Sequence, residues 1–146
     1  MYRVLSCLAL LLCWPSSVLA SLPETIAQIK PSVVAIGIHS PLGAPQIRLI
    51  GTGFAVADGS KIVTNYHVIA SRLNLDRNEQ YVVLSGNADK VKVHPIVSSR
   101  HEAMYDLAVL NITERLPALA LGSEQLQAEG TAIAFTGFPI TAVLGL

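Results

Sequence analysis

The sequence predicts an all-β domain, a six- to seven-stranded antiparallel β-barrel preceded by one short helix. Short runs rich in Val, Ile, Ala and Thr recur along the chain, and turn-forming residues such as Asp58-Gly59-Ser60 separate them. Short strands at such regular spacing are typical of sandwiches and barrels. A length of 146 residues also fits one domain at most.

The helix comes first and the strands follow it. Apolar residues at 22, 26 and 29 have helical spacing, and Pro31 ends that pattern. Alternation fails at Pro95, which indicates a bulge or an edge. The expected strands are Ser32–Ile38, Ile47–Val56, Lys61–Thr64, Tyr81–Leu84, Val91–Val97, Leu107–Ile112 and Thr131–Thr136.

Residues 1–20 have the features of a cleaved secretory signal. Met1-Tyr2-Arg3 carries one positive charge, and the apolar run from Val4 to Cys13 is too short to span a membrane. Small residues up to Ala20 provide a cleavage site, so we expect residues 21–146 to form a secreted or periplasmic mature chain. An uncleaved signal that anchors the chain in the membrane is the alternative.

Composition excludes several classes of partner. Both cysteines, Cys7 and Cys13, lie in the signal segment, so the mature chain has no disulfide and depends on its apolar core. Ten basic and ten acidic residues are present without a block of like charge. This pattern argues against a nucleic-acid partner and against electrostatic binding to a membrane surface.

A histidine and an aspartate each lie at the end of an expected strand. His67 comes shortly after Lys61–Thr64, and Asp106 directly precedes Leu107–Ile112. Acyl transfer by a serine needs a base, a carboxylate that orients the base, and amide donors for the oxyanion. His67 is the candidate base and Asp106 the candidate orienting carboxylate. Taken alone, each has an ordinary structural explanation, a core histidine and a loop cap, but the neighbouring motifs favour the catalytic interpretation.

Six short motifs follow one another along the mature chain: Pro31-Ser32-Val33-Val34-Ala35-Ile36, Gly51-Thr52-Gly53-Phe54, Val63-Thr64-Asn65-Tyr66-His67-Val68, Asp106-Leu107-Ala108-Val109-Leu110, Leu119-Ala120-Leu121-Gly122-Ser123 and Gly137-Phe138-Pro139. In this order they resemble HtrA-like (trypsin-like) serine proteases. The resemblance implies a chymotrypsin-type fold of two six-stranded barrels, of which this chain holds the first. It also implies that His67 and Asp106 are the catalytic histidine and aspartate, with no cofactor.

The sequence does not contain a recognisable catalytic serine. Ser123 is the only serine after Asp106, and it lacks the Gly-x-Ser-Gly arrangement whose amides converge on an oxyanion. We expect Ser123 to be a turn or cap residue. The resemblance implies that a second barrel, absent here, supplies the serine, the oxyanion donors and the specificity pocket. By itself the chain is therefore expected to be inactive.

Other polar residues have structural interpretations. We interpret His39, His94 and His101 as surface-loop histidines, and because no His-x-x-x-His or Cys-x-x-Cys pattern is present, no metal site is expected. Gly51 and Gly53 are not followed by Gly-Lys-Ser or Gly-Lys-Thr, which excludes a phosphate loop. They indicate a strand whose backbone passes close to a neighbour.

Two functions remain open at this point. The first is a secreted or periplasmic serine endopeptidase that hydrolyses polypeptide substrates through an acyl-enzyme, with residues 21–146 as its incomplete N-terminal barrel. The second is a non-catalytic, single-barrel binding module in which His67 and Asp106 are inherited remnants. A lone barrel would expose the face meant for its partner barrel, which favours self-association.

Overall fold

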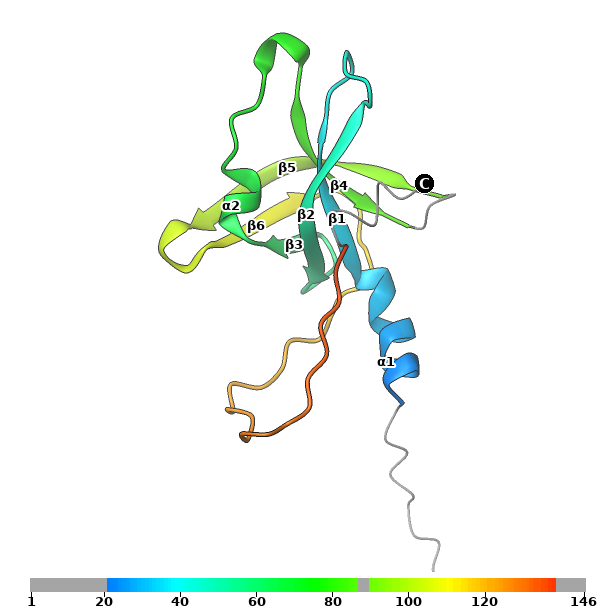
Figure 1. The fold of residues 1–146 in the computed structure, drawn as a ribbon, viewed down its shortest axis with the longest axis vertical. Helices are drawn as coiled ribbons and strands as arrows, with labels where there is room; N and C mark the ends of the chain where they lie inside the picture. Colours follow the sequence, from blue (N-terminus) through cyan, green and yellow to red (C-terminus); the bar gives the residue numbers. More distant parts are fainter. Residues whose placement is uncertain (1–20, 87–89, 139–146) are drawn as a thin grey trace, which may run out of the picture.

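The computed structural model describes residues 21–86 and 90–138. Six antiparallel strands form a closed barrel in the order β1-β2-β3-β6-β5-β4, with helix α1 at its base (Figure 1). The predicted fold class is confirmed. The expected signal segment and its cleavage position after Ala20 lie outside the described residues.

The helices and strands have the following bounds: α1 (Leu22–Ile29), β1 (Val33–His39), β2 (Ile47–Val56), β3 (Lys61–Thr64), α2 (Tyr66–Ile69), β4 (Gln80–Ser85), β5 (Lys92–Glu102) and β6 (Leu107–Ile112). Short 3₁₀ turns lie at Lys30–Ser32, Leu75–Arg77 and Ala103–Tyr105.

Helix α1 begins with a capping box and ends at a proline. The Ser21 hydroxyl accepts a hydrogen bond from the Glu24 N–H, and the Glu24 carboxylate accepts one from the Ser21 N–H at 2.9 Å. After Ile29 the chain tightens into the 3₁₀ turn that contains Pro31, because proline lacks the N–H that would continue the helix. The predicted helix and its end are confirmed.

The barrel interior is filled by aliphatic side chains from alternating strand positions. Ile36, Ile62, Val83 and Leu110 are at most 1% exposed and belong to the main core cluster. Strand β1 is buried on both faces, since Ala35 packs outward into a second cluster that also involves Phe138. Phe138 therefore packs on the outer face of β1, which is paired with β2 on one side and β4 on the other.

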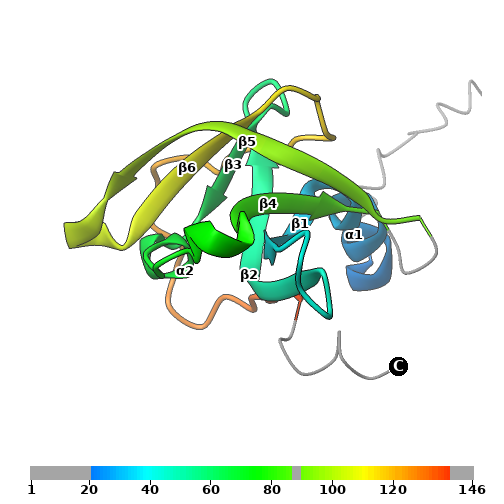
Figure 2. The same ribbon diagram turned by 90° about the horizontal axis from the view of Figure 1, so that it is seen from above.

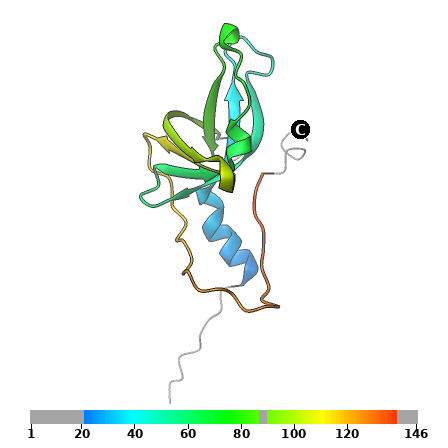
Figure 3. The same cartoon turned by 90° about the vertical axis from the view of Figure 1, so that its left-hand side faces the viewer.

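The prediction of a seventh strand at Thr131–Thr136 is wrong. This segment is irregular and runs outside the barrel (Figure 3), and Ile133 and Phe135 are 72% and 92% exposed. Six strands already close the barrel, and none of the described strands pairs with this segment. Its β-rich composition favoured a strand, but no partner is available.

The interpretation of three histidines as surface-loop residues is wrong. His39 lies in β1, and His94 and His101 lie in β5. The imidazole of His94 is buried: its Nε2 is 2.8 Å from the Ser85 hydroxyl, and its Nδ1 is 3.2 Å from a Glu114 carboxylate oxygen, without good hydrogen-bond alignment. Burial of this polar ring is tolerated because residues from other parts of the chain contact both of its nitrogens.

The expected irregularity near Pro95 is confirmed, because the β5–β6 register shifts between Ile96 and Ser98. Helices α1 and α2 lie on different sides of the barrel (Figures 1 and 2). Within the described residues, neither helix has the length and apolar character that crossing a membrane would require.

Candidate active site

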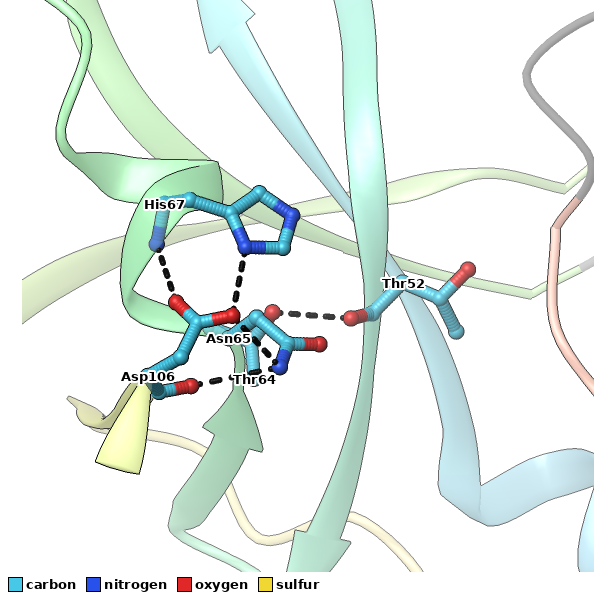
Figure 4. Close-up of polar contacts among 5 residues, drawn as sticks. All are labelled: Thr52, Thr64, Asn65, His67 and Asp106. Carbon is cyan, nitrogen blue, oxygen red and sulfur yellow. Dashed lines mark hydrogen bonds and ion pairs between the residues drawn. The ribbon is translucent and has the colours of Figure 1, made fainter. Parts of the chain in front are cut away.

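The position of His67 is fixed by the end of β3. The strand stops at Thr64, whose buried hydroxyl donates a 2.8 Å hydrogen bond to the carbonyl of Thr52 on β2 (Figure 4). Asn65 keeps an extended conformation, and the single-turn helix α2 then begins. His67 is the second residue of α2, so its side chain leaves the barrel at the rim and is 71% exposed.

Asp106 approaches from the neighbouring strand. Strands β3 and β6 are antiparallel with Thr64 opposite Ala108, so the end of β3 meets the start of β6. Asp106 directly precedes β6 in the left-handed conformation, with φ 48° and ψ 43°. Aspartate tolerates this conformation better than most residues, and the turn that it closes directs the carboxylate towards α2. Pairing of the two strands therefore determines that His67 and Asp106 meet.

The two side chains are in direct contact. His67 Nδ1 lies 2.6 Å from Asp106 Oδ2, and the backbone N–H of His67 donates to Asp106 Oδ1 at 2.8 Å (Figure 4). The Asn65 amide donates to Asp106 Oδ2 at 3.1 Å and to the Asp106 carbonyl at 3.2 Å. The predicted contact is confirmed, and the catalytic roles of the two residues stay a prediction.

Hydrogen bonds keep the Asp106 carboxylate charged. The backbone N–H of His67 contributes most to lowering the pKa of Asp106, and the hydrogen bond with the His67 ring adds to it. An ionised carboxylate can only accept, so the neutral ring must carry its proton on Nδ1. Nε2 is then left with a free lone pair at the rim. This tautomer is the one that a general base needs.

Replacement of Asp106 by asparagine tests this charge. The folded-state pKa of Asp106 lies below 3.8, the ordinary value for an aspartate, so the carboxylate contributes stability above pH 3.8 and loses it as the pH falls through its folded-state pKa. We expect Asp106→Asn, which keeps the left-handed backbone accessible, to be less stable than the wild type at pH 7. Denaturant unfolding between pH 7 and pH 2 should show the difference shrinking below pH 3.8. A difference independent of pH would contradict the assignment.

Helix α2 is held against the barrel by a close approach to β2. Val68 is buried in the main core cluster, directly over Gly51. A Cβ atom on Gly51 would lie 2.6 Å from Val68 Cγ1, and one on Gly53 would lie 2.9 Å from Ile62 Cγ2. The close backbone approach predicted for these glycines is confirmed. The absence of a side chain at Gly51 thus lets α2, and with it His67, pack closely against the barrel.

Gly51→Ala is expected to destabilise the protein by about 1–3 kcal/mol, the usual cost of overpacking. The matched test is a double-mutant cycle with Val68→Ala, which removes the two methyl groups in the way. We expect the double variant to be more stable than the sum of the single effects predicts, as measured by chemical denaturation. Strict additivity of the changes in unfolding free energy would show that residues 51 and 68 are not in steric conflict.

Several supporting residues were not assigned a role from the sequence. Asn65 anchors Asp106, and Tyr66 stacks on His101 with ring centroids 4.4 Å apart and planes 12° apart. Asn65 lies two positions before the histidine in the sequence, and this short spacing is a signal that sequence reasoning could have used. The Tyr66–His101 stack has no such signal, because it depends on the β5–β6 hairpin folding back over α2.

No nucleophile accompanies the pair in the part of the chain that the structure describes. No serine there is hydrogen-bonded to His67, and Ser123 is exposed on the irregular C-terminal segment. Between residues 21 and 138, leaving out 87–89, no group of three or more His, Cys, Asp or Glu side chains could hold a metal ion. The described arrangement can orient a base but cannot complete acyl transfer.

A closed six-stranded antiparallel barrel with a histidine–aspartate pair at its rim defines a class of protein, the barrel of trypsin-type proteases. The family model described as "Trypsin-like peptidase domain" matches residues 51–144. The chain belongs to this family, and the resemblance predicted from the sequence is confirmed.

Two solved structures are similar to this chain. The active form of the Rv3671c protease from M. tuberculosis has 25% identity and a TM-score of 0.51, over 70% of this chain and 40% of that one. Deg5 has 32% identity and a TM-score of 0.48, over 70% of this chain and 48% of that one. The chain thus spans less than half the length of each. A comparison with curated proteins found no match.

Proposed function

We propose that the protein is the His- and Asp-bearing part of a trypsin-like, HtrA-like serine endopeptidase, with His67 as general base and Asp106 as its orienting carboxylate. The 2.6 Å contact between His67 Nδ1 and Asp106 Oδ2 carries this proposal. Exposure of the ring at the barrel rim supports it, because Nε2 must reach a serine on another part of the enzyme.

The proposed chemistry is peptide-bond hydrolysis through an acyl-enzyme, without a cofactor. Nε2 of His67 takes the proton of the serine hydroxyl as its oxygen attacks the substrate carbonyl, and then gives that proton to the leaving amine. Asp106 stabilises the imidazolium that exists between these two steps. A second barrel supplies the serine, the oxyanion donors and the pocket that selects polypeptide substrates. The same two residues then activate a water molecule that hydrolyses the ester.

A fluorophosphonate probe tests the proposal directly. The gene is expressed together with any coding sequence that follows codon 146, and the labelled serine is located by mass spectrometry. We expect one labelled serine outside residues 21–138, and loss of labelling in the His67→Ala variant. Labelling of Ser123, or labelling that survives His67→Ala, would contradict the proposal.

We also propose a secreted or periplasmic location, with cleavage after Ala20. The capping box supports this position, since Ser21 is the first residue that α1 needs. After cleavage the Ser21 nitrogen would be an ammonium group, which the Glu24 carboxylate at 2.9 Å would neutralise. Mass spectrometry of the exported protein should find Ser21 at the N-terminus, and a retained segment 1–20 would overturn this assignment.

A second candidate is a non-catalytic barrel that binds a protein partner or a copy of itself. The observation in its favour is the exposure of large apolar side chains on the C-terminal segment: Leu121, Leu126, Ile133 and Phe135. Such side chains favour association. Light scattering of the full chain distinguishes the candidates, because a clean monomer over a wide concentration range would argue against self-association.

A further inference from the structure

The outer face of β3, β6 and β5 carries a depression that the proposed catalysis does not use. Its volume is about 580 Å³. His67 and Asp106 do not line it, because they lie at the end of β3 and the start of β6, while most of the lining comes from the opposite end of these strands. The lining residues are Lys61, Ser98, Arg100, Val109 and Asn111.

Strand register brings these residues together. Asn111 lies opposite Lys61 on β3 and opposite Ser98 on β5, which makes one row across three strands. Val109 lies two positions before Asn111 on the same face of β6, and it is opposite Arg100 on β5. Successive side chains of a strand point to opposite faces, so the intervening Leu110 faces the core and these residues face outward.

Hydrogen bonds fix the polar row. Lys61 Nζ donates to Asn111 Oδ1 at 3.4 Å, and Asn111 Nδ2 donates to Ser98 Oγ at 3.0 Å. Because the Ser98 oxygen accepts, its own proton is free to point outward. The row therefore offers an ammonium group and a hydroxyl as oriented donors to a ligand in the depression.

The depression is positively charged and holds no acid. No carboxylate is among its lining residues. Among the residues that the structure describes, none of the ion pairs includes Lys61 or Arg100. Two cations beside one hollow repel each other, and an anion between them would interact favourably with both.

We propose that this depression binds a soluble phosphate monoester. Lys61 provides a point charge and Arg100 a planar fork of donors, the two groups that proteins use most for phosphate. A phosphate monoester carries close to two negative charges at neutral pH, which matches the two cations. The volume exceeds that of the ion alone and lies in the range of small-molecule sites, and Val109 provides an apolar floor for the organic part.

The test is a titration of the full chain with phenyl phosphate, followed by the NMR signals of the Asn111 side-chain amide. We expect saturable binding that inorganic phosphate displaces. Lys61→Gln and Arg100→Gln should each weaken it at least about tenfold, since each removes one charge-assisted contact to the phosphate. Arg48→Gln is the matched control, because it removes one positive charge from an exposed position on β2 outside the depression.

Three outcomes would overturn the proposal. One is the absence of saturable binding at low ionic strength. Another is equal weakening by Arg48→Gln, which would show a general charge effect. The third is binding to vesicles that contain phosphatidic acid without binding to soluble phenyl phosphate, since the site would then serve a membrane surface. Peptidase activity is not part of the readout, so this proposal and the proposed function fail independently.

Discussion

Replacing His67 with alanine is expected to reduce the proposed peptidase activity by about 10⁶-fold in kcat, the loss typical of removing the base of a serine triad. Asp106→Asn should cost about 10⁴-fold, because an amide at this position no longer holds the imidazole in the Nδ1–H tautomer. The 2.6 Å contact between the two side chains is the physical basis of both expectations. The measurement is steady-state hydrolysis of a peptide substrate.

His39→Ala is the matched control for this pair of variants. His39 is also a histidine of the barrel, but it lies at the end of β1 opposite Ile47 and Gln80 and does not contact Asp106. Its variant should keep activity within a few-fold of the wild type. If His67→Ala also retained activity within tenfold, His67 would not be the base, whatever its contact with Asp106.

Replacing Gly59 with alanine is expected to cost about 2–5 kcal/mol of unfolding free energy. Two effects add: the left-handed backbone costs about 1–2 kcal/mol for a residue with a Cβ, and overpacking adds about 1–3 kcal/mol. Gly59 has φ 87° in the turn between β2 and β3, and a Cβ there would overlap the carbonyl oxygen of Leu116. The backbone of Leu116 cannot move away from Gly59 without breaking a hydrogen bond, because the Leu116 N–H donates to the Gly59 carbonyl at 3.0 Å.

Two other glycines separate these effects. Gly130 has φ 82° and open space around its Cβ position, so Gly130→Ala reports the backbone cost alone. Gly122 has neither feature, and Gly122→Ala should be close to neutral. Chemical denaturation of the three variants should rank Gly59→Ala as the most destabilised and Gly122→Ala as the least. Equal stability of Gly59→Ala and Gly130→Ala would show that the contact with Leu116 is unimportant.

Much of the barrel is predictable from local pattern. All six of its strands overlap runs of β-forming residues that the sequence predicted, and α1 is bounded by a capping box and Pro31. The pattern failed at Thr131–Thr136, where residues with high β propensity have no strand beside them. A strand needs a partner as well as a composition, and none of the described strands pairs with this segment.

The candidate site was also partly predictable. His67 and Asp106 were found from their places at strand ends together with the neighbouring motifs, but the role of Asn65 and the stack of Tyr66 on His101 were not found. The buried environment of His94 was missed for the same reason. Its partners, Ser85 and Glu114, come from other parts of the chain, and nothing local marks a histidine whose two nitrogens are contacted from a distance.

The sequence by itself determined the class of fold, the helix and the two residues of the candidate site, because periodicity, turn residues and strand-end positions are local properties of a chain. Only the tertiary structure decided that the Nδ1 of His67 meets the carboxylate of Asp106, that α2 packs closely over Gly51, and that Lys61 and Arg100 line one depression. Each of these depends on register between strands far apart in sequence, and register is set when the barrel closes around its core.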